Sequence, residues 1–175
     1  MNTYVKKEIV RLIKQYYSKN ELNDTSYRLL DVGSLDINGT IKNKIPKAWE
    51  YVGADILPGK NVDALMLYPF KLPFDNNTFD CIVSSSCLEH CTNPLKLVPE
   101  MARVLKPKGY MFIVAPFISP RHEVQEDGTI LKDCWRFLPN GFDYLFEAAN
   151  IKKLHTYNHK RKANRVYCWG IGKKE

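Results

Sequence analysis

Several features are scarce or missing in this sequence of 175 residues. No apolar run approaches the ~20 residues of a membrane-spanning helix, and the first residues lack the apolar core of a secretion signal. The five cysteines are an odd number without a Cys-x-x-Cys pair, a pattern typical of reduced thiols rather than of a disulfide scaffold. No internal repeat or linker divides the chain. These absences predict a cytoplasmic protein with no membrane span and a single domain over residues 1–175.

The glycine patterns that bind phosphates are incomplete. No third glycine follows Gly33 at the spacing of a dinucleotide-binding loop, and no Gly-Lys-Ser/Thr marks a P-loop. Yet the apolar run before Gly33 indicates a buried parallel strand that ends in a polar loop, where ligands of open α/β sheets bind. A second apolar run ends at Asp55, 22 positions after Gly33, which suits a carboxylate that binds a ribose diol. The pattern predicts a nucleoside ligand without a pyrophosphate.

The rest of the chain alternates between strand and helix patterns. Apolar residues at helical spacing predict an amphipathic helix within residues 1–20, and Pro139 opens a later helix. We also expect a short crossover helix at 39–44, strands at 61–67, 79–86 and 110–117, and a helix that starts at Asn93-Pro94 and that Pro99 kinks or delays. The tail, residues 151–175, predicts two strands joined by a basic turn. These elements predict an α/β fold of three layers that ends in an antiparallel hairpin.

Four blocks occur in a specific order along the chain. They are Leu-Leu-Asp-Val-Gly-Ser at 29–34, Tyr-Val-Gly-Ala-Asp-Ile at 51–56, Leu-Pro-Phe-Asp-Asn-Asn-Thr-Phe-Asp at 72–80, and Leu-Glu-His at 88–90 leading to Glu-Met-Ala-Arg-Val-Leu-Lys-Pro at 100–107. Through them the chain resembles the class I S-adenosylmethionine-dependent methyltransferases, of the broad type that includes quinone-biosynthesis methyltransferases. A narrower likeness to a compact subgroup with mostly undefined substrates rests on residues 33–39 and 133–139.

The resemblance implies a Rossmann-like fold with a mostly parallel sheet, a cofactor-binding core at 27–150 and S-adenosylmethionine as cofactor. It implies that Gly33 and Ser34 let the methionine and ribose of the cofactor approach the backbone, and that Asp31 holds the loop or the amino group. In the same way, Asp55 would bind the ribose hydroxyls and Ile56 would lie against the adenine.

Other positions in this set match or depart from the family pattern. Ser84 and Ser85 would border the methionine moiety. Leu35 stands where the second glycine of the loop is usual, and Tyr68 stands where an acid often pairs with the adenine amine. Stacking by Tyr68 could replace that contact. We also expect Leu35 to be among the residues that bind the cofactor.

A base is needed in methyl transfer only when the acceptor loses a proton, and histidine is the natural base near neutral pH. His90 is one candidate, because we expect Glu89 and His90 to begin the helix after the strand at 79–86. The alternative is that Glu89 forms a cap or a pair and that His90 packs against the sheet, which is the more frequent arrangement.

The long connection at 119–136 favours a lid or substrate loop. It supplies the other candidates for catalysis, His122, Asp133 and Arg136. Arginine next to Trp135 suits an anionic or planar acceptor. Equally, an Asp133–Arg136 pair could fold the loop onto itself and bury Trp135.

A metal site is not expected. Cys87, His90 and Cys91 have i, i+3, i+4 spacing, with Cys81 and Cys134 as further ligands, but ligation needs four convergent groups. Buried thiols are therefore favoured.

The leading hypothesis is methyl transfer from S-adenosylmethionine to oxygen, nitrogen or carbon of a small metabolite that could be anionic. A net charge of +7 and the basic run at 159–165 support a nucleic-acid methyltransferase instead. No Asn/Asp-Pro-Pro-aromatic signature for flipped bases supports it. The departures at Leu35 and Tyr68 motivate a third hypothesis, a catalytically silent binding module with the same fold.

Overall fold

The computed structural model describes residues 3–37, 39–126, 128–160 and 165–175. Its centre is a sheet of seven strands in the order β3-β2-β1-β4-β5-β9-β8. The first four pairs in this order run parallel, and β5–β9 and β9–β8 run antiparallel. The strands are β1 Arg28–Val32, β2 Glu50–Asp55, β3 Ala64–Leu65, β4 Phe79–Ser85, β5 Leu105–Ile118, β8 Lys152–Lys160 and β9 Val166–Lys173.

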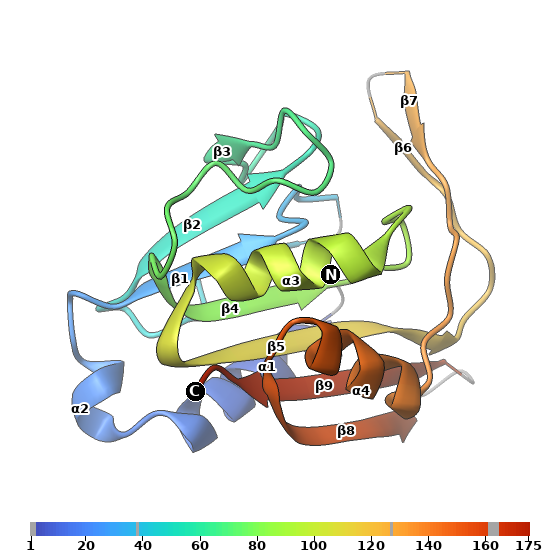
Figure 1. Cartoon of the computed structure of the whole chain (residues 1–175). Helices are drawn as coiled ribbons and strands as arrows, with labels where there is room; N and C mark the ends of the chain where they lie inside the picture. The colour runs from blue at the N-terminus through green and yellow to red at the C-terminus, as the bar shows by residue number, and fades with distance from the viewer. Residues whose placement is uncertain (1–2, 38, 127, 161–164) are drawn as a thin grey trace.

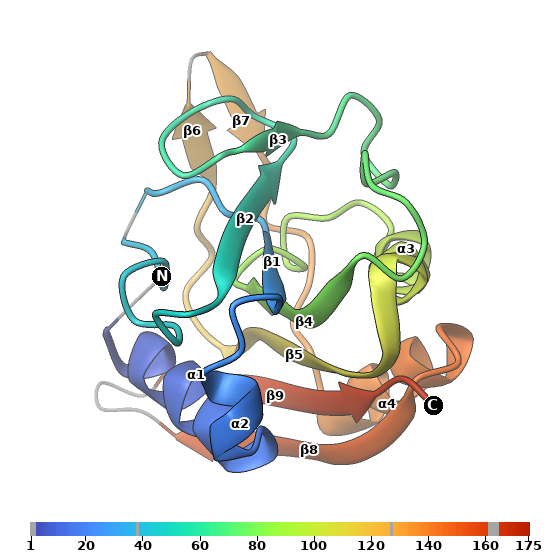
Figure 2. The same cartoon turned by 90° about the vertical axis from the view of Figure 1, so that its left-hand side faces the viewer.

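Helices cover both faces of this sheet, which gives three layers (Figures 1 and 2). Helices α3 (Pro94–Val104) and α4 (Pro139–Ala148) pack on one face, and α1 (Thr3–Tyr16) packs on the other. Helix α2 (Lys19–Leu22) follows α1, and a separate hairpin of β6 (Val124–Glu126) and β7 (Thr129–Leu131) rises beyond the sheet (Figure 1). The expected Rossmann-like α/β fold with a terminal antiparallel hairpin is confirmed.

Strand residues alternate between two apolar clusters because successive side chains of a strand point to opposite faces. Leu30 and Val32 pack with α3 and α4, whereas Leu29, which directly precedes Leu30, packs with α1. The α1 cluster also holds Ile41, Ile45 and Trp49 from the β1–β2 connection, so this connection covers the sheet without a regular helix. None of the helices in the described ranges is long and apolar enough to cross a membrane.

Several expected elements differ in extent from the structure. The crossover helix expected at 39–44 is reduced to one hydrogen-bonded turn, in which the N–H of Ile45 and that of Lys44 donate to Ile41 O. The strand expected at 61–67 shrinks to the two residues of β3, because Asn61 has a φ of +67° in a turn and only Ala64 and Leu65 pair with β2. Helix α3 runs through Pro99 instead of starting after it.

The segment after β4 also differs from the expectation. Glu89 and His90 lie in a turn, and α3 begins only at Pro94. Asn93 occupies the N-cap position without a side-chain cap hydrogen bond. Glu89 and His90 are therefore placed by the turn after β4 rather than by a helix.

Candidate active site

A cavity of about 440 Å³ opens at the carboxyl ends of β1 and β2. The end of each strand contributes to its wall, as do the turn after β4 and residues of the β6–β7 hairpin. A volume of this size suits a small-molecule site. The wall consists of Val32, Gly33, Leu35, Ile37, Asp55, Ile56, Met66, Pro69, Phe70, Ser86, Cys87, His90, Cys91, Thr92, Leu97, Val124, Ile130, Leu131 and Lys132.

The loop after β1 requires a glycine at its first position. Gly33 has a φ of +82°, and a Cβ added there would lie 2.4 Å from the Cβ of Cys87. The N–H groups of Gly33 and Ser34 both donate to Ala54 O, at 2.9 and 3.2 Å, so this loop is anchored to β2. The loop thus passes close to the turn after β4, with no room for a side chain between them.

Leu35, which replaces the second glycine of the family pattern, is accommodated by a glycine elsewhere. A Cβ on Gly59 would lie 2.4 Å from Cδ1 of Leu35, so the leucine side chain occupies the space that Gly59 leaves free. The departure at position 35 therefore leaves the loop close to β2.

Asp55 presents its carboxylate to the cavity from the end of β2. The residue is only 8% exposed, and its oxygens accept the N–H groups of Leu35 at 3.0 Å and Leu57 at 3.2 Å. Burial raises the pKa of Asp55, while these hydrogen bonds oppose the rise. Because each carboxylate oxygen has a second lone pair, both can still accept a hydroxyl. The chemistry of this donor set fits a ribose diol.

The structure divides the nine cofactor candidates into two sets. Gly33, Leu35, Asp55 and Ile56 belong to the cavity wall. The other five, Asp31, Ser34, Tyr68, Ser84 and Ser85, lie outside it.

Two of these five form hydrogen bonds within the sheet. The hydroxyl of Ser84 donates to Val32 O at 3.0 Å and so ties β4 to β1. Asp31 accepts the hydroxyl of Tyr51 at 2.8 Å, and burial raises the pKa of this carboxyl to about 7.

The remaining three contrast in exposure. Tyr68 is 69% exposed, whereas Ser34 and Ser85 are buried, with hydroxyls that have no hydrogen-bond partner among the described residues.

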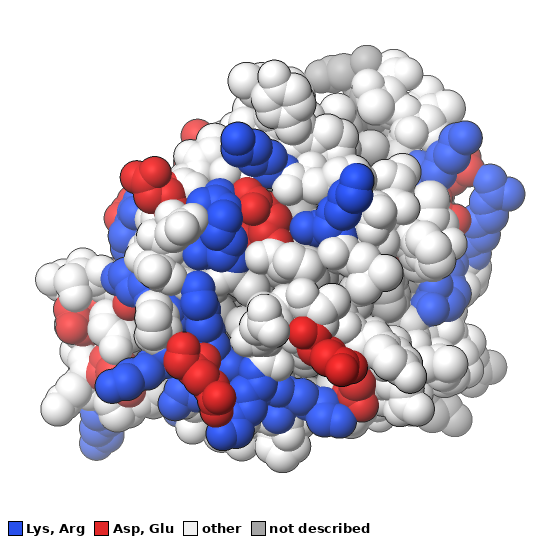
Figure 3. Space-filling model, viewed as in Figure 1, with Lys and Arg blue, Asp and Glu red and all other residues white. Residues whose placement is uncertain are grey.

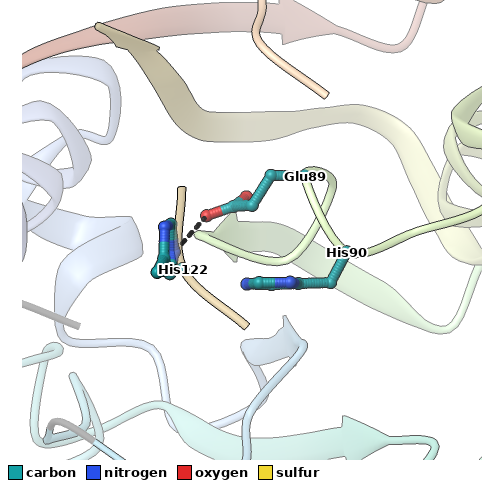
Figure 4. Close-up of side chains that lie close together, drawn as sticks. All are labelled: Glu89, His90 and His122. Atoms are coloured by element: carbon teal, nitrogen blue, oxygen red, sulfur yellow. Dashed lines mark ion pairs between the residues drawn. The ribbon is translucent and has the colours of Figure 1, made fainter. Parts of the chain in front are cut away.

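Glu89, His90 and His122 form a cluster beside the cavity (Figure 4). Glu89 is 0% exposed, and neither of its carboxylate oxygens has a hydrogen-bond partner in the described part of the chain. Burial raises the pKa of Glu89 to about 8, and Asp133 adds to the rise. His122 Nε2 lies 3.9 Å from Glu89 Oε1. His90, whose pKa is lowered by burial, meets the His122 ring edge-on with centroids 5.2 Å apart.

Asp133 and Arg136 pair with each other. The two guanidinium nitrogens of Arg136 donate to the two carboxylate oxygens of Asp133 at 2.5 and 2.7 Å, and this bonding lowers the pKa of Asp133 to about 2. Arg136 also donates to the carbonyls of Ser119, Pro120 and Trp135. The guanidinium expected to contact an anionic acceptor is thus engaged within its own loop.

Two further bonds fasten this loop to the turn after β4. The N–H of Cys134 donates to Glu89 O at 2.7 Å, and the indole N–H of Trp135 donates to Cys91 O at 2.7 Å. Trp135 is nevertheless 44% exposed, so the alternative that buries it is wrong in that respect. The connection at 119–136 is therefore attached to the cavity wall at its second half.

Several residues of the cavity wall were not singled out as site residues from the sequence. The sequence pattern indicates only buried thiols at Cys87 and Cys91, and it indicates no site role for Met66, Phe70 or the hairpin. The Asp-Gly pair that starts at residue 127 is a hairpin signal that could have located β6 and β7, and Gly128 indeed has a φ of +76°. Of the basic run at 159–165, residues 161–164 lie outside the described residues.

Comparison with known proteins identifies the family and supports the fold. Residues 30–113 match a family model described as a methyltransferase domain. The ubiquinone/menaquinone biosynthesis C-methyltransferase UbiE of Vibrio cholerae is 31% identical over 127 residues, which cover 67% of this chain and 46% of that protein. The chain thus spans less than half of the length of this curated relative.

Solved structures share the fold across nearly the whole chain. YcgJ from Bacillus subtilis aligns with a TM-score of 0.68 at 14% identity and covers 99% of both chains. A phosphoethanolamine N-methyltransferase of Haemonchus contortus, in complex with S-adenosylhomocysteine, aligns with a TM-score of 0.69 at 14% identity, over 96% of this chain and 52% of that one. The family model, the relative and the shared fold lead to one conclusion: the chain belongs to the class I S-adenosylmethionine-dependent methyltransferases.

Proposed function

We propose that this protein transfers a methyl group from S-adenosylmethionine to a small molecule bound in the cavity beneath the β6–β7 hairpin. The observation that carries the proposal is Asp55, whose carboxylate borders the cavity at the carboxyl end of β2. In open α/β sheets a nucleoside binds at this edge, and an acid at the end of the second strand is suited to its ribose.

The residues around Asp55 fit the other parts of the cofactor. Ile56 offers an apolar surface to the adenine, and the backbone at Gly33 has no side chain that would keep the methionine away. When bound, the cofactor supplies a methyl group on a positively charged sulfur. The protein then has to align the acceptor with that methyl group and exclude water, and the hairpin residues Ile130 and Leu131 cover the cavity for this purpose.

The acceptor that the cavity favours is largely apolar. Met66, Phe70, Leu97, Ile130 and Leu131 contribute to its wall, whereas charged side chains of both signs are dispersed over the outer face drawn in Figure 3. Leu67 and Tyr68, between cavity residues Met66 and Pro69, are exposed as well. The name of the UbiE relative, a C-methyltransferase of quinone biosynthesis, agrees with such an acceptor. The case for an anionic acceptor is weaker, because Arg136 is engaged and, among the described residues, Lys132 is the one lysine or arginine of the wall.

Titration calorimetry with S-adenosylmethionine and S-adenosylhomocysteine tests the proposal. We expect wild type to bind both, and Asp55→Ala to bind at least about 30-fold more weakly, because two charge-assisted hydrogen bonds to the ribose are lost. Asp75→Ala is the matched control, since it removes an exposed carboxylate that does not belong to the cavity wall. Absence of binding by folded wild type would reject the proposal in favour of the catalytically silent module.

A further inference from the structure

The cluster of Glu89, His90 and His122 is not explained by methyl transfer alone. A buried carboxylate without a hydrogen-bond partner is costly, because nothing compensates the loss of its hydration. Glu89 is in this situation, although its side chain is only 1% exposed and lies in a chain rich in basic residues. A carboxyl group at such a buried position is therefore expected to bind a ligand that is not part of the chain.

Both histidines of the cluster are oriented in the manner of metal ligands. His90 Nδ1 lies 3.1 Å from Lys132 O, and His122 Nδ1 lies 3.3 Å from Asp133 Oδ2 and 3.3 Å from Pro120 O. These oxygens can only accept, so Nδ1 of each ring is the donor and Nε2 is the nitrogen that can bind a metal. A histidine that binds a metal through one nitrogen typically donates its other N–H to a carbonyl or carboxylate.

The three ligand groups also converge. One ligand atom from each of Glu89, His90 and His122 lies within 4.8 Å of the others, and the close-up shows all three side chains directed toward one another (Figure 4). Tetrahedral bonds of about 2.0–2.2 Å place ligand atoms about 3.4 Å apart. Because Glu89 and His90 are neighbours in a turn and the His122 side chain is 44% exposed, small side-chain rotations can close this difference.

The local charge suits a cation. Asp133 is paired with Arg136, whereas Glu89 forms no ion pair with a lysine or an arginine among the described residues and can release its proton when a cation binds. Two imidazoles and one carboxylate are the ligand set of catalytic zinc sites, which keep a fourth position open. The thiols of Cys91 and Cys134 lie on neighbouring segments but not in the cluster.

We propose that Glu89, His90 and His122 bind a divalent transition-metal ion, with Zn²⁺ as the best match, at the wall of the cavity. His90 belongs to that wall, so the open coordination position borders the space assigned to the acceptor. This last step rests on the proposed function: an acceptor that uses the metal would present a hydroxyl or carboxylate oxygen to it. The metal site itself does not depend on methyl transfer.

The experiment is titration of the metal-free protein with Co²⁺ alone, followed by absorption spectroscopy, and then competition with Zn²⁺. We expect one Co²⁺ per chain, with visible bands of a tetrahedral nitrogen and oxygen site. Glu89→Gln and His122→Asn are each expected to weaken binding at least about tenfold. Glu123→Gln and His155→Asn are the controls, because both residues lie outside the cluster, and they should bind as wild type does.

Two results would overturn the proposal. One is the absence of binding by wild type at micromolar Co²⁺. The other is a thiolate-to-cobalt charge-transfer band that disappears in Cys134→Ala, because it would assign the metal to the cysteines. If Glu89→Gln fails to fold, His122→Asn, on the solvent side of the cluster, still decides the question.

The metal site and the proposed function can fail separately. Asp55→Ala is expected to lose S-adenosylmethionine binding and to keep Co²⁺ binding, whereas Glu89→Gln is expected to do the opposite. A variant that loses both ligands while it remains folded would contradict the independence of the two sites.

Discussion

The wall of the cavity formed by β1 and β2 is held mainly by backbone N–H groups, whereas the opposite wall, formed by the turn after β4 and residues 119–136, also depends on bonds between side chains. On the first wall, the N–H groups of Gly33, Ser34 and Leu35 all bond to residues at the end of β2. On the second, the Trp135 indole and the N–H of Cys134 attach the loop to the turn after β4, and the Asp133–Arg136 pair holds the loop together. The first wall therefore depends on the chain path and tolerates changes such as Leu35, and the second depends on the identity of a few residues.

The largest effect on stability is expected from adding a side chain at Gly33. Gly33→Ala places a Cβ at a positive φ and 2.4 Å from Cys87, so we expect the free energy of unfolding to fall by about 3 kcal/mol. Denaturant unfolding measures this change. Gly141→Ala is the control, because its Cβ would meet no atom within 4 Å, and alanine should stabilise helix α4 slightly. Equal stability of Gly33→Ala and wild type would show that the loop can move away from the turn.

Removal of the Asp133–Arg136 pair is expected to lower the free energy of unfolding by a smaller amount. Asp133→Ala removes a buried partner from Arg136, and since the arginine is partly exposed we expect a loss of about 2 kcal/mol. Hydrogen exchange should show faster exchange of the amides at 132–137, while the affinity for S-adenosylmethionine changes little. Arg121→Ala breaks an exposed pair in the same segment and should cost less than about 0.5 kcal/mol. Similar losses in the two variants would refute the role assigned to Asp133.

A smaller effect, on the pH dependence of stability, is expected from Asp31 in β1. The folded-state pKa of Asp31 is raised to about 7 by burial, so the stability linked to its proton is fully present below the unfolded pKa of about 3.9 and is lost as the pH rises through about 7. Asp31→Asn removes this titration and can still accept the Tyr51 hydroxyl. Its stability relative to wild type should therefore improve by on the order of 1 kcal/mol between pH 5 and pH 8. Thermal unfolding across this range, with the exposed Asp75→Asn as control, would contradict the assignment if the two variants behaved alike.

The smallest effect is expected at Tyr68, which lies outside the cavity wall. Tyr68→Ala should change the affinity for S-adenosylmethionine by less than about twofold, whereas Ile56→Ala, within the wall, should weaken it about fivefold through lost apolar contact. Calorimetry of both variants makes the comparison. A strong loss in Tyr68→Ala would restore the stacking role expected from the sequence.

Much of the fold could be predicted from the sequence, because the signals are local. The apolar run before Gly33, the acid at Asp55 and the Asn93-Pro94 helix start each lie within a few residues of the structure they specify. The turn that holds Glu89 and His90 was mistaken for a helix, since the proline at 94 rather than the preceding residues sets the helix start. Nor could the sequence bring His122 to Glu89, because that contact depends on how the connection at 119–136 attaches to the turn after β4.

The two outer strands of the sheet bear on how the protein behaves when it is concentrated. β3 has two residues, and β8, with nine, carries Lys152 and Lys153, which pair with Glu175 and Asp143. An exposed edge strand can add a strand from another molecule unless it is short or charged. One edge of this sheet is too short for that addition and the other presents charged side chains to an incoming strand. We therefore expect the protein to resist aggregation through its sheet edges.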